Sequence, residues 1–335
     1  MMRQTTARRR TALPAPGILL LAAALAVPAP AEEAKPAPAV TAAQAMKLSG
    51  FTQFEGLAQS AGTDNLTVRR ARFSLTGDLL KNLKFKVGVD AVKSPLLIDA
   101  QIDWTIRPAA AFRFGQFKVP FSQESLSSSA DLDFVERSQA VLKLVPGQDL
   151  GSSGRDIGAL FTGRASIFEY SVGLFNGAGI NKSDTNSQKD LAARLAVRPA
   201  NGLSLAASVY DGRYSAQSGA VPVIRDRAGV EAAWTFRVFS LKGEYIWARD
   251  GEVDKSGGYL QAGVFLRPKK IQALLRFDAY DKDRGAPGDR SEAWTAGLNW
   301  FFAERTKLQV NYVLTRLEDG TTLNKAVQVR LQVGY

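Results

Sequence analysis

Charged side chains recur at every second position along much of this chain, and the chemistry open to them is ion binding. Lys84 and Lys86 alternate with apolar residues, and Asp99 and Asp103 do the same further along. Arginine and lysine donate N–H groups to anions, and the planar arginine fork can bond two oxygens of a phosphate at once. The other members of this alternating set are Arg70, Arg72, Arg113, Arg194, Arg227, Lys242, Arg276, Lys307, Arg330, Asp78, Asp90, Glu169, Asp190, Glu231, Glu244 and Asp278.

The composition excludes several classes of reaction centre. The chain has 335 residues, with no histidine and no cysteine. Without histidine there is no Ser-His-Asp triad, no histidine-ligated metal and little routine general-base chemistry. Without cysteine there is neither a disulfide nor a reactive thiol. We therefore expect a protein that is not an enzyme and that carries no metal or other cofactor.

The N-terminus has the pattern of a secretory signal peptide. A basic cluster at 8–10 precedes an apolar run over 17–27 and the small residues Ala29-Pro30-Ala31, and the run is shorter than the ~20 residues that a membrane-spanning helix needs. We predict a signal peptide over 1–31, a flexible Ala/Pro-rich leader over 32–46 and one domain over 47–335; a buried N-terminal helix is the alternative for the first segment.

The net charge of +11 does not point to nucleic acid. Removing the four arginines of the signal peptide from the 43 basic residues leaves 39, against 32 acidic residues. These charges are spread along the whole chain instead of being clustered on one helix or arm. An exported protein also rarely meets nucleic acid, and we expect no such partner.

The hydrophobic period of the mature chain is two. Val327, Val329, Leu331, Val333 and Tyr335 alternate with polar residues or glycine at the C-terminus, and strict alternation indicates a strand with one apolar face. Sixteen segments of about ten residues show this pattern. They lie near 47–57, 66–79, 83–92, 97–107, 110–119, 155–164, 166–176, 188–198, 203–212, 226–237, 239–250, 257–267, 270–281, 291–302, 305–316 and 325–335.

The connections between these segments alternate in length. Short turns, three of them beginning Arg-Pro at 107–108, 198–199 and 267–268, alternate with longer polar loops. This asymmetry is typical of an outer-membrane barrel. A soluble β-sandwich would also alternate, but its strands average five or six residues. Aromatic residues also lie at the ends of the apolar faces, where an interfacial girdle would place them: Trp104, Tyr245, Trp247, Trp294, Trp300 and Tyr335.

We therefore predict an all-β fold, a transmembrane 16-stranded antiparallel up-and-down β-barrel. A barrel of this size leaves an aqueous channel, into which the alternating charges would point. The one connection that breaks the rhythm runs from 120 to about 154, and long loops in compact domains are usually functional. We expect this third outer loop to fold inward and narrow the channel.

Three stretches carry a family resemblance. RRARFSLTGDL (69–79), FRFGQFKVPFSQESLSSSADLDFVERSQA (112–140) and GRDIGALFTG (154–163) resemble blocks of the phosphate-selective porins O and P. The resemblance implies a trimeric bacterial outer-membrane porin, in contact with membrane lipid and lipopolysaccharide, through which small anions such as phosphate diffuse. It places Lys118, Ser122, Ser127, Ser128 and Arg137 at or near the constriction, and Arg70, Arg72 and Arg113 on a basic track leading to it.

Two questions stay open at the level of sequence. Acidic residues nearly balance basic residues on the predicted channel face, so anion preference depends on which charges meet the channel. A non-conducting structural or adhesive outer-membrane barrel is the alternative function, and a barrel hydrolase is disfavoured by the lack of histidine.

Overall fold

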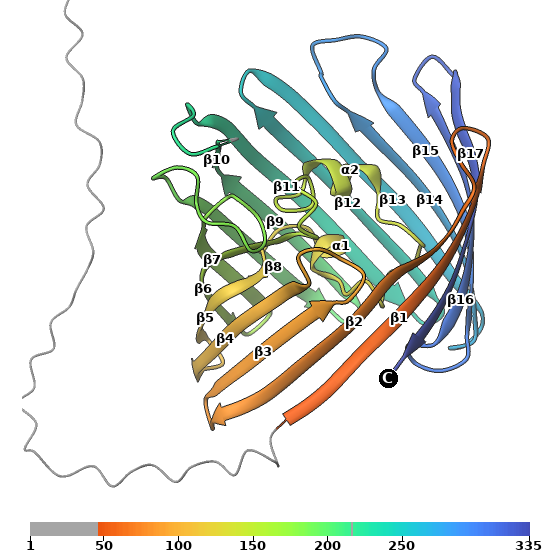
Figure 1. Cartoon of the computed structure of the whole chain (residues 1–335). Coiled ribbons are helices and arrows are strands. Elements are labelled where there is room, and N and C mark those ends of the chain that lie inside the picture. Colours follow the sequence, from red (N-terminus) through yellow and green to blue (C-terminus); the bar gives the residue numbers. More distant parts are fainter. Residues whose placement is uncertain (1–45, 216) are drawn as a thin grey trace, which may run out of the picture. The chain divides into compact units, whose positions relative to one another are not determined.

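One closed antiparallel sheet makes up the computed structural model, which describes residues 46–215 and 217–335 (Figure 1). The predicted signal peptide and residues 32–45 of the predicted leader lie outside these residues. Strand β1 (Met46–Gln59) pairs with β2 (Asn65–Leu80) on one side and with β17 (Thr322–Gly334) on the other, and this second pairing closes the barrel. The two-residue β10 (Arg213–Tyr214) continues β9 (Leu203–Asp211) beyond Gly212 and pairs with β11 (Val223–Phe236) in the same register. Sixteen full-length strands therefore form the wall, as predicted.

The strands follow the predicted segments closely. Three strands start three or four residues earlier than expected: β11 at Val223 instead of 226, β13 at Val253 instead of 257 and β17 at Thr322 instead of 325. The bounds are β1 (Met46–Gln59), β2 (Asn65–Leu80), β3 (Leu83–Asp90), β4 (Leu97–Arg107), β5 (Ala110–Lys118), β6 (Arg155–Ala165), β7 (Phe168–Phe175), β8 (Asp190–Ala200), β9 (Leu203–Asp211), β10 (Arg213–Tyr214), β11 (Val223–Phe236), β12 (Phe239–Asp250), β13 (Val253–Arg267), β14 (Ile271–Asp281), β15 (Ser291–Phe301), β16 (Lys307–Leu317) and β17 (Thr322–Gly334).

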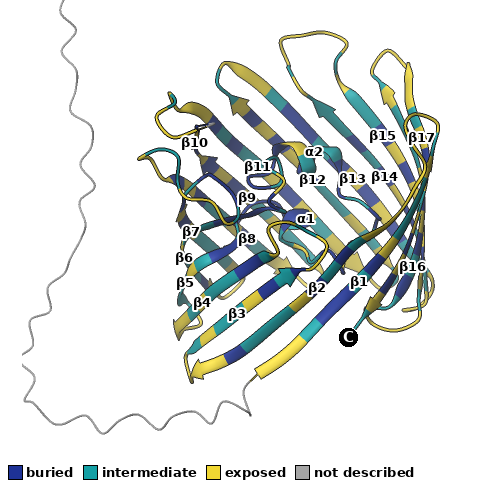
Figure 2. Ribbon diagram, viewed as in Figure 1, coloured by how far each residue is buried: buried dark blue, intermediate teal, exposed yellow. Residues whose placement is uncertain are grey.

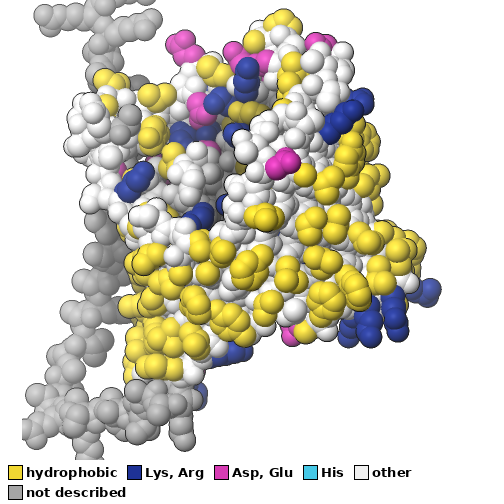
Figure 3. Space-filling model, turned by 45° about the vertical axis from the view of Figure 1, so that its right-hand side comes forward, with side chains coloured by type: hydrophobic (Ala, Val, Ile, Leu, Met, Phe, Trp, Pro, Cys, Tyr) yellow, Lys and Arg dark blue, Asp and Glu magenta, His cyan; other side chains and the backbone are white. Residues whose placement is uncertain are grey.

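Burial is inverted relative to a soluble protein. In β16, Val310 and Tyr312 are 37% and 48% exposed, whereas Gln309 and Asn311, which precede them in the chain, are each 1% exposed. Water-soluble proteins normally bury the apolar set. The same alternation runs around the barrel (Figure 2), and the apolar side chains form a band over its outer surface (Figure 3). The outer face is therefore suited to lipid and the inner face to water.

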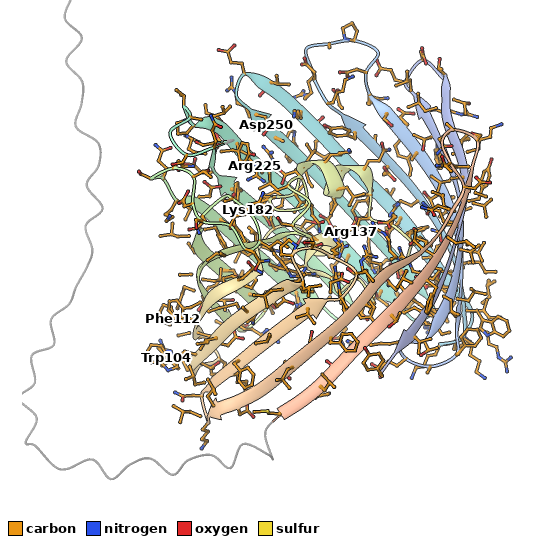
Figure 4. All side chains as sticks on the ribbon, in the orientation of Figure 1. Trp104, Phe112, Arg137, Lys182, Arg225 and Asp250 are labelled. Atoms are coloured by element: carbon orange, nitrogen blue, oxygen red, sulfur yellow. The ribbon has the colours of Figure 1, made fainter. Side chains whose placement is uncertain are left out.

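Aromatic residues mark the outer face. The six predicted girdle residues are all at least 40% exposed. Trp104 and Phe112 lie on the outside of the wall near the ends of their strands (Figure 4), with ring centroids 6.0 Å apart. These positions confirm the alternation predicted from the sequence.

The segment 119–154, between β5 and β6, contains two short helices, α1 (Gln123–Leu126) and α2 (Gln139–Leu144). No helix within the described parts of the chain is long and apolar enough to cross a membrane. The segment packs closely on the polar face of the wall: a Cβ added at Gly257 of β13 would lie 2.9 Å from the Ala140 Cβ of α2. Glycine at 257 therefore permits this contact.

Candidate pore constriction

The first turn of α1 is bound to two carboxylates of the wall. The backbone N–H of Gln123 donates to Glu231 Oε2 of β11 (2.5 Å), and the N–H of Glu124 donates to Glu244 Oε1 of β12 (2.7 Å). The first N–H groups of a helix have no partner within the helix, and carboxylates satisfy them well. Tyr259 Oη also donates to Glu244 Oε1 (2.8 Å). These wall carboxylates are thus used to hold the segment.

Glu124 joins the two helices of the segment. Its Oε2 accepts from the backbone N–H and the hydroxyl of Ser138, at 2.9 and 3.0 Å, just before α2. Burial raises the pKa of Glu124 above its ordinary value, although Arg276 opposes the shift. At the start of α2, the Gln139 side chain donates to Asp278 Oδ1 of β14 (2.9 Å). Four carboxylates are therefore covered here, none more than 8% exposed: Glu124, Glu231, Glu244 and Asp278.

Side-chain donors of the wall bind the stretch between the helices. Lys307 Nζ donates to the carbonyl of Leu132 (2.6 Å), and Asn299 Nδ2 donates to the carbonyl of Asp133 (2.8 Å). Further such bonds come from Gln53, Arg276, Gln309 and Gln332. The sequence predicts that Lys307 and Arg276 point into the channel, but the segment covers this part of the wall and both side chains bind its backbone.

The far end of the segment is held by arginines. Asp149 accepts two bonds from Arg225 of β11, at 2.5 and 3.1 Å, and one from Arg227 (3.1 Å). Arg227 Nε also donates to the carbonyl of Leu144 at the end of α2 (2.8 Å). Charge-assisted and bidentate bonds of this kind are the strong ones. The segment is thus fixed to β11 through β17 along its length.

A polar cavity of about 480 Å³ remains on the other side of the segment, against β1 through β6. Its lining is strongly basic: one carboxylate, Asp99, faces six cationic side chains. These are Arg72, Lys86, Arg113, Lys118, Arg155 and Arg305. In the lining of this cavity, cations therefore outnumber acids.

Ion pairs hold the cavity cations in position. Arg155 bonds both oxygens of Asp99, at 2.8 and 3.1 Å, and Lys86 Nζ lies 3.0 Å from the same carboxylate. Arg113 Nε donates to Asp103 Oδ1 (2.5 Å). The side chains of Lys86 and Arg113 are nevertheless each 33% exposed. They can therefore contact a solute while they remain anchored.

Four of the eight sequence-predicted site residues line this cavity: Arg72, Arg113, Lys118 and Ser128. Arg72 is held by Asp90 Oδ2 (2.9 Å) and by the Ser129 hydroxyl (3.1 Å). Lys118 Nζ donates to three carbonyls, those of Ser125, Leu126 and Ser127, at 2.6 to 3.0 Å. All three of its N–H groups therefore bind the C-terminal end of α1.

The other four residues lie outside the cavity lining. Ser122 is the N-cap of α1 and accepts from the Ser125 N–H (3.1 Å), and the Ser127 hydroxyl donates to the Gln123 carbonyl (2.8 Å). Arg137 is 5% exposed, and Figure 4 shows it inside the ring of strands. It donates to the carbonyls of Glu124 and Ser127, at 3.1 and 3.0 Å.

Arg70 belongs to a buried cluster around Glu136. Its Nη1 donates to Gln53 Oε1 (2.9 Å), while Arg69 and Arg330 contact the Glu136 carboxylate at 3.0 and 3.2 Å. Burial alone would raise the pKa of Glu136. The positive charge of Arg70, followed by that of the other two arginines, outweighs burial and lowers the pKa to about 2.

The cavity also contains cations that were not among the eight predicted residues, Lys86, Arg155 and Arg305. Lys86 shares the polar face of β3 with Lys84, so the alternation alone could have suggested it. Arg155 opens β6 and pairs with Lys118 across the ladder. Arg305 lies in the turn before β16, and no sequence signal links it to this cavity.

A closed barrel of sixteen long strands, apolar outside and polar inside, defines a channel-forming protein of the outer membrane. The model of the family "Phosphate-selective porin O and P" matches residues 47–224 and 211–335, and the chain belongs to this family. It is an outer-membrane porin, a channel for the passive diffusion of small hydrophilic solutes.

Solved structures show the same fold at low sequence identity. OmpT of Vibrio cholerae matches with a TM-score of 0.64 and 10% identity, over 87% of this chain and 97% of that one. The outer-membrane channel DcaP of Acinetobacter baumannii gives 0.62 and 14%, with the same coverage. Salmonella typhi OmpF, in complex with daunomycin, gives 0.67 and 10%, again over 87% and 97%. The search of curated proteins found no match.

Proposed function

We propose that this porin prefers anions and that its constriction lies between the inward-folded third loop, segment 119–154, and the basic wall of β2 through β6. The observation that carries the proposal is the cavity with six cations and one carboxylate in its lining. Low-dielectric walls focus the field of the few charges in such a passage. Anions would therefore enter it more readily than cations.

The position of the segment bears on the balance of charge. Glu124, Glu231 and Glu244 are covered by the segment and its anchors, as is Asp278. Carboxylates removed from the passage attract few cations into it. The most exposed cations of the cavity lining are Lys86, Arg113 and Arg305, whose side chains are 33%, 33% and 45% exposed.

Phosphate or polyphosphate is the solute that the family description suggests. Arg113 offers the N–H groups not used by Asp103, and Lys86 on β3 and the Ser128 hydroxyl line the same cavity. A guanidinium fork with nearby donors suits a tetrahedral oxyanion. Arg72, Lys118 and Arg137 would act mainly by fixing the shape of the passage, since their donors are directed to protein oxygens.

The same proposal includes the cellular setting of the chain. Residues 1–31 would direct export, and the apolar band would contact membrane lipid and lipopolysaccharide. A homotrimer is favoured by the trimer form described for Vibrio cholerae OmpT. Catalysis has no part in this account, because passive diffusion needs none.

The direct test is the current carried by the purified protein in planar bilayers, in potassium chloride and in potassium phosphate. We expect stepwise, ohmic conductance in both salts. Insertion without any conductance would overturn the proposal and favour a structural or adhesive barrel instead. Hydrolysis of lipid or peptide substrates by the same preparation would contradict the non-enzymatic part.

A further inference from the structure

Basic residues gather on two neighbouring short turns at one rim of the barrel. Arg237 lies in the turn between β11 and β12, and Arg267, Lys269 and Lys270 end β13 or follow it. The turns adjoin, since the N–H of Phe265 donates to the carbonyl of Val238 (2.9 Å). We call these four exposed cations the basic rim. Among the described residues, none of the four has a carboxylate oxygen within 4.0 Å.

The basic rim lies at the edge of the lipid-facing surface. The Arg237 guanidinium is 5.2 Å from the ring centre of Phe236, which is 49% exposed on the outer face. Figure 3 shows basic side chains directly below the hydrophobic band. Arg237 and Lys269 both have a positive φ, 53° and 57°, a conformation that glycine or asparagine would adopt more easily. Cations thus occupy turn positions that local backbone preference would assign to other residues.

An apolar groove runs along the outer face of the same strands. It holds about 640 Å³ between Trp234, Leu241, Tyr245, Leu260 and Phe277, over a floor of small residues that includes Ala232 and Gly243. Trp234 and Leu241 pair at the end of the groove nearest the turn that carries Arg237, and only two further residue pairs separate them from that turn. At the rise of a strand this is about 7 Å, within the reach of one lipid from headgroup to acyl chain.

We propose that the basic rim and this groove form a binding site for one anionic phospholipid of the membrane. The headgroup phosphate would lie against Arg237 and Lys269, and an acyl chain would occupy the groove. Short turns of outer-membrane barrels face the periplasm, so the lipid would come from the inner leaflet. The site lies on the outer surface and does not depend on the ion preference of the pore.

The test is native mass spectrometry of the purified full-length mature protein with phosphatidylglycerol or phosphatidylcholine of identical acyl chains. Each cation near a membrane surface contributes about 1 kcal/mol, or roughly fivefold in binding. We expect wild type to retain phosphatidylglycerol at least fivefold better than phosphatidylcholine, and Arg237→Gln/Lys269→Gln to lose this preference. Lys81→Gln/Arg107→Gln, which removes two exposed cations from other short turns, is the matched control and keeps it.

A second variant tests the groove separately. Ala232→Leu places a larger side chain on its floor and is expected to weaken both lipids without changing their ratio. Equal retention of the two lipids by wild type, or the same loss in the control as in the basic-rim variant, would overturn the proposal. Displacement of phosphatidylglycerol by inorganic phosphate, with Ala232→Leu binding as wild type does, would overturn the acyl-chain contact.

Discussion

The backbone N–H of Glu124, in α1, donates to the carboxylate of Glu244 on β12, with 2.7 Å between nitrogen and oxygen. The two residues are 120 positions apart in the chain. Together with the bond from Gln123 to Glu231, this contact places α1 on the acidic part of the wall. The segment therefore covers acids and leaves the cations of β2 through β6 in the remaining cavity.

Loss of the Glu244 acceptor should loosen the segment. In Glu244→Ala the N–H of Glu124 and the hydroxyl of Tyr259 both lose their partner, and each unsatisfied buried group costs about 1–3 kcal/mol. We expect more frequent transitions between current levels in single-channel recordings and a larger mean conductance. Glu244→Gln keeps an acceptor oxygen and should behave closer to wild type. Identical recordings for Glu244→Ala and wild type would contradict this anchoring role.

Breaking the buried Arg155–Asp99 pair should destabilise the barrel more than breaking an exposed pair. Both side chains are nearly buried, at 6% and 4% exposed, and the bond is bidentate. Arg155→Met leaves Asp99 buried with Lys86 alone, and breaking a buried pair costs about 3–5 kcal/mol. Arg164→Met removes an exposed partner of Glu169 and should cost less than about 1 kcal/mol. Urea unfolding in lipid vesicles compares the stabilities of the two variants, and equal unfolding midpoints for both would contradict this prediction.

Acid should weaken the Glu136 cluster. Its arginines lower the pKa of this carboxyl to about 2 from an ordinary value of 4.5. A depressed acid pKa gives stability that is fully present above the ordinary value and is lost as the pH falls toward the folded-state value. We expect the unfolding temperature of wild type to decrease from pH 4.5 toward pH 2, and Glu136→Gln to show a smaller decrease. Glu252→Gln, in an outer turn, is the control and should follow wild type.

The outer face should reject charge according to depth. Leu275 lies near the middle of β14 and is 49% exposed, whereas Leu79, 44% exposed, is one residue from the end of β2. Arginine on the lipid face costs about 2–4 kcal/mol at the bilayer centre and about 0–1 kcal/mol near its edge. Leu275→Arg should therefore destabilise the barrel folded in vesicles far more than Leu79→Arg does. Similar costs at the two positions would argue against a lipid-facing band.

The wall of this protein could be predicted from its sequence, because lipid outside and water inside impose a period of two on every strand. Gln309 and Val310 illustrate this: neighbours in the chain, they lie on opposite faces, as the alternation predicts. Register follows in turn, since a shift by one residue would exchange the two faces. Strand ends were harder to predict, as β13 shows, because alternation fades where both faces meet water.

The site was less predictable, since it depends on which part of the wall the segment covers. Arg72 and Arg276 have the same alternation pattern, yet Arg72 lines the cavity while Arg276 lies beneath the segment. Nothing in the spacing of either residue distinguishes them. The contacts that do, such as the bond from Lys307 to the carbonyl of Leu132, join positions 175 residues apart.

The zero-current potential across a gradient of potassium chloride, measured on purified protein in planar bilayers, tests the central claim most directly. We predict a potential of the sign that shows chloride to be more permeant than potassium. Lys86→Gln/Arg113→Gln should move it toward the value of an unselective pore, whereas Lys182→Gln, in an outer loop (Figure 4), should leave it unchanged. A potassium-favouring potential in wild type would contradict the account.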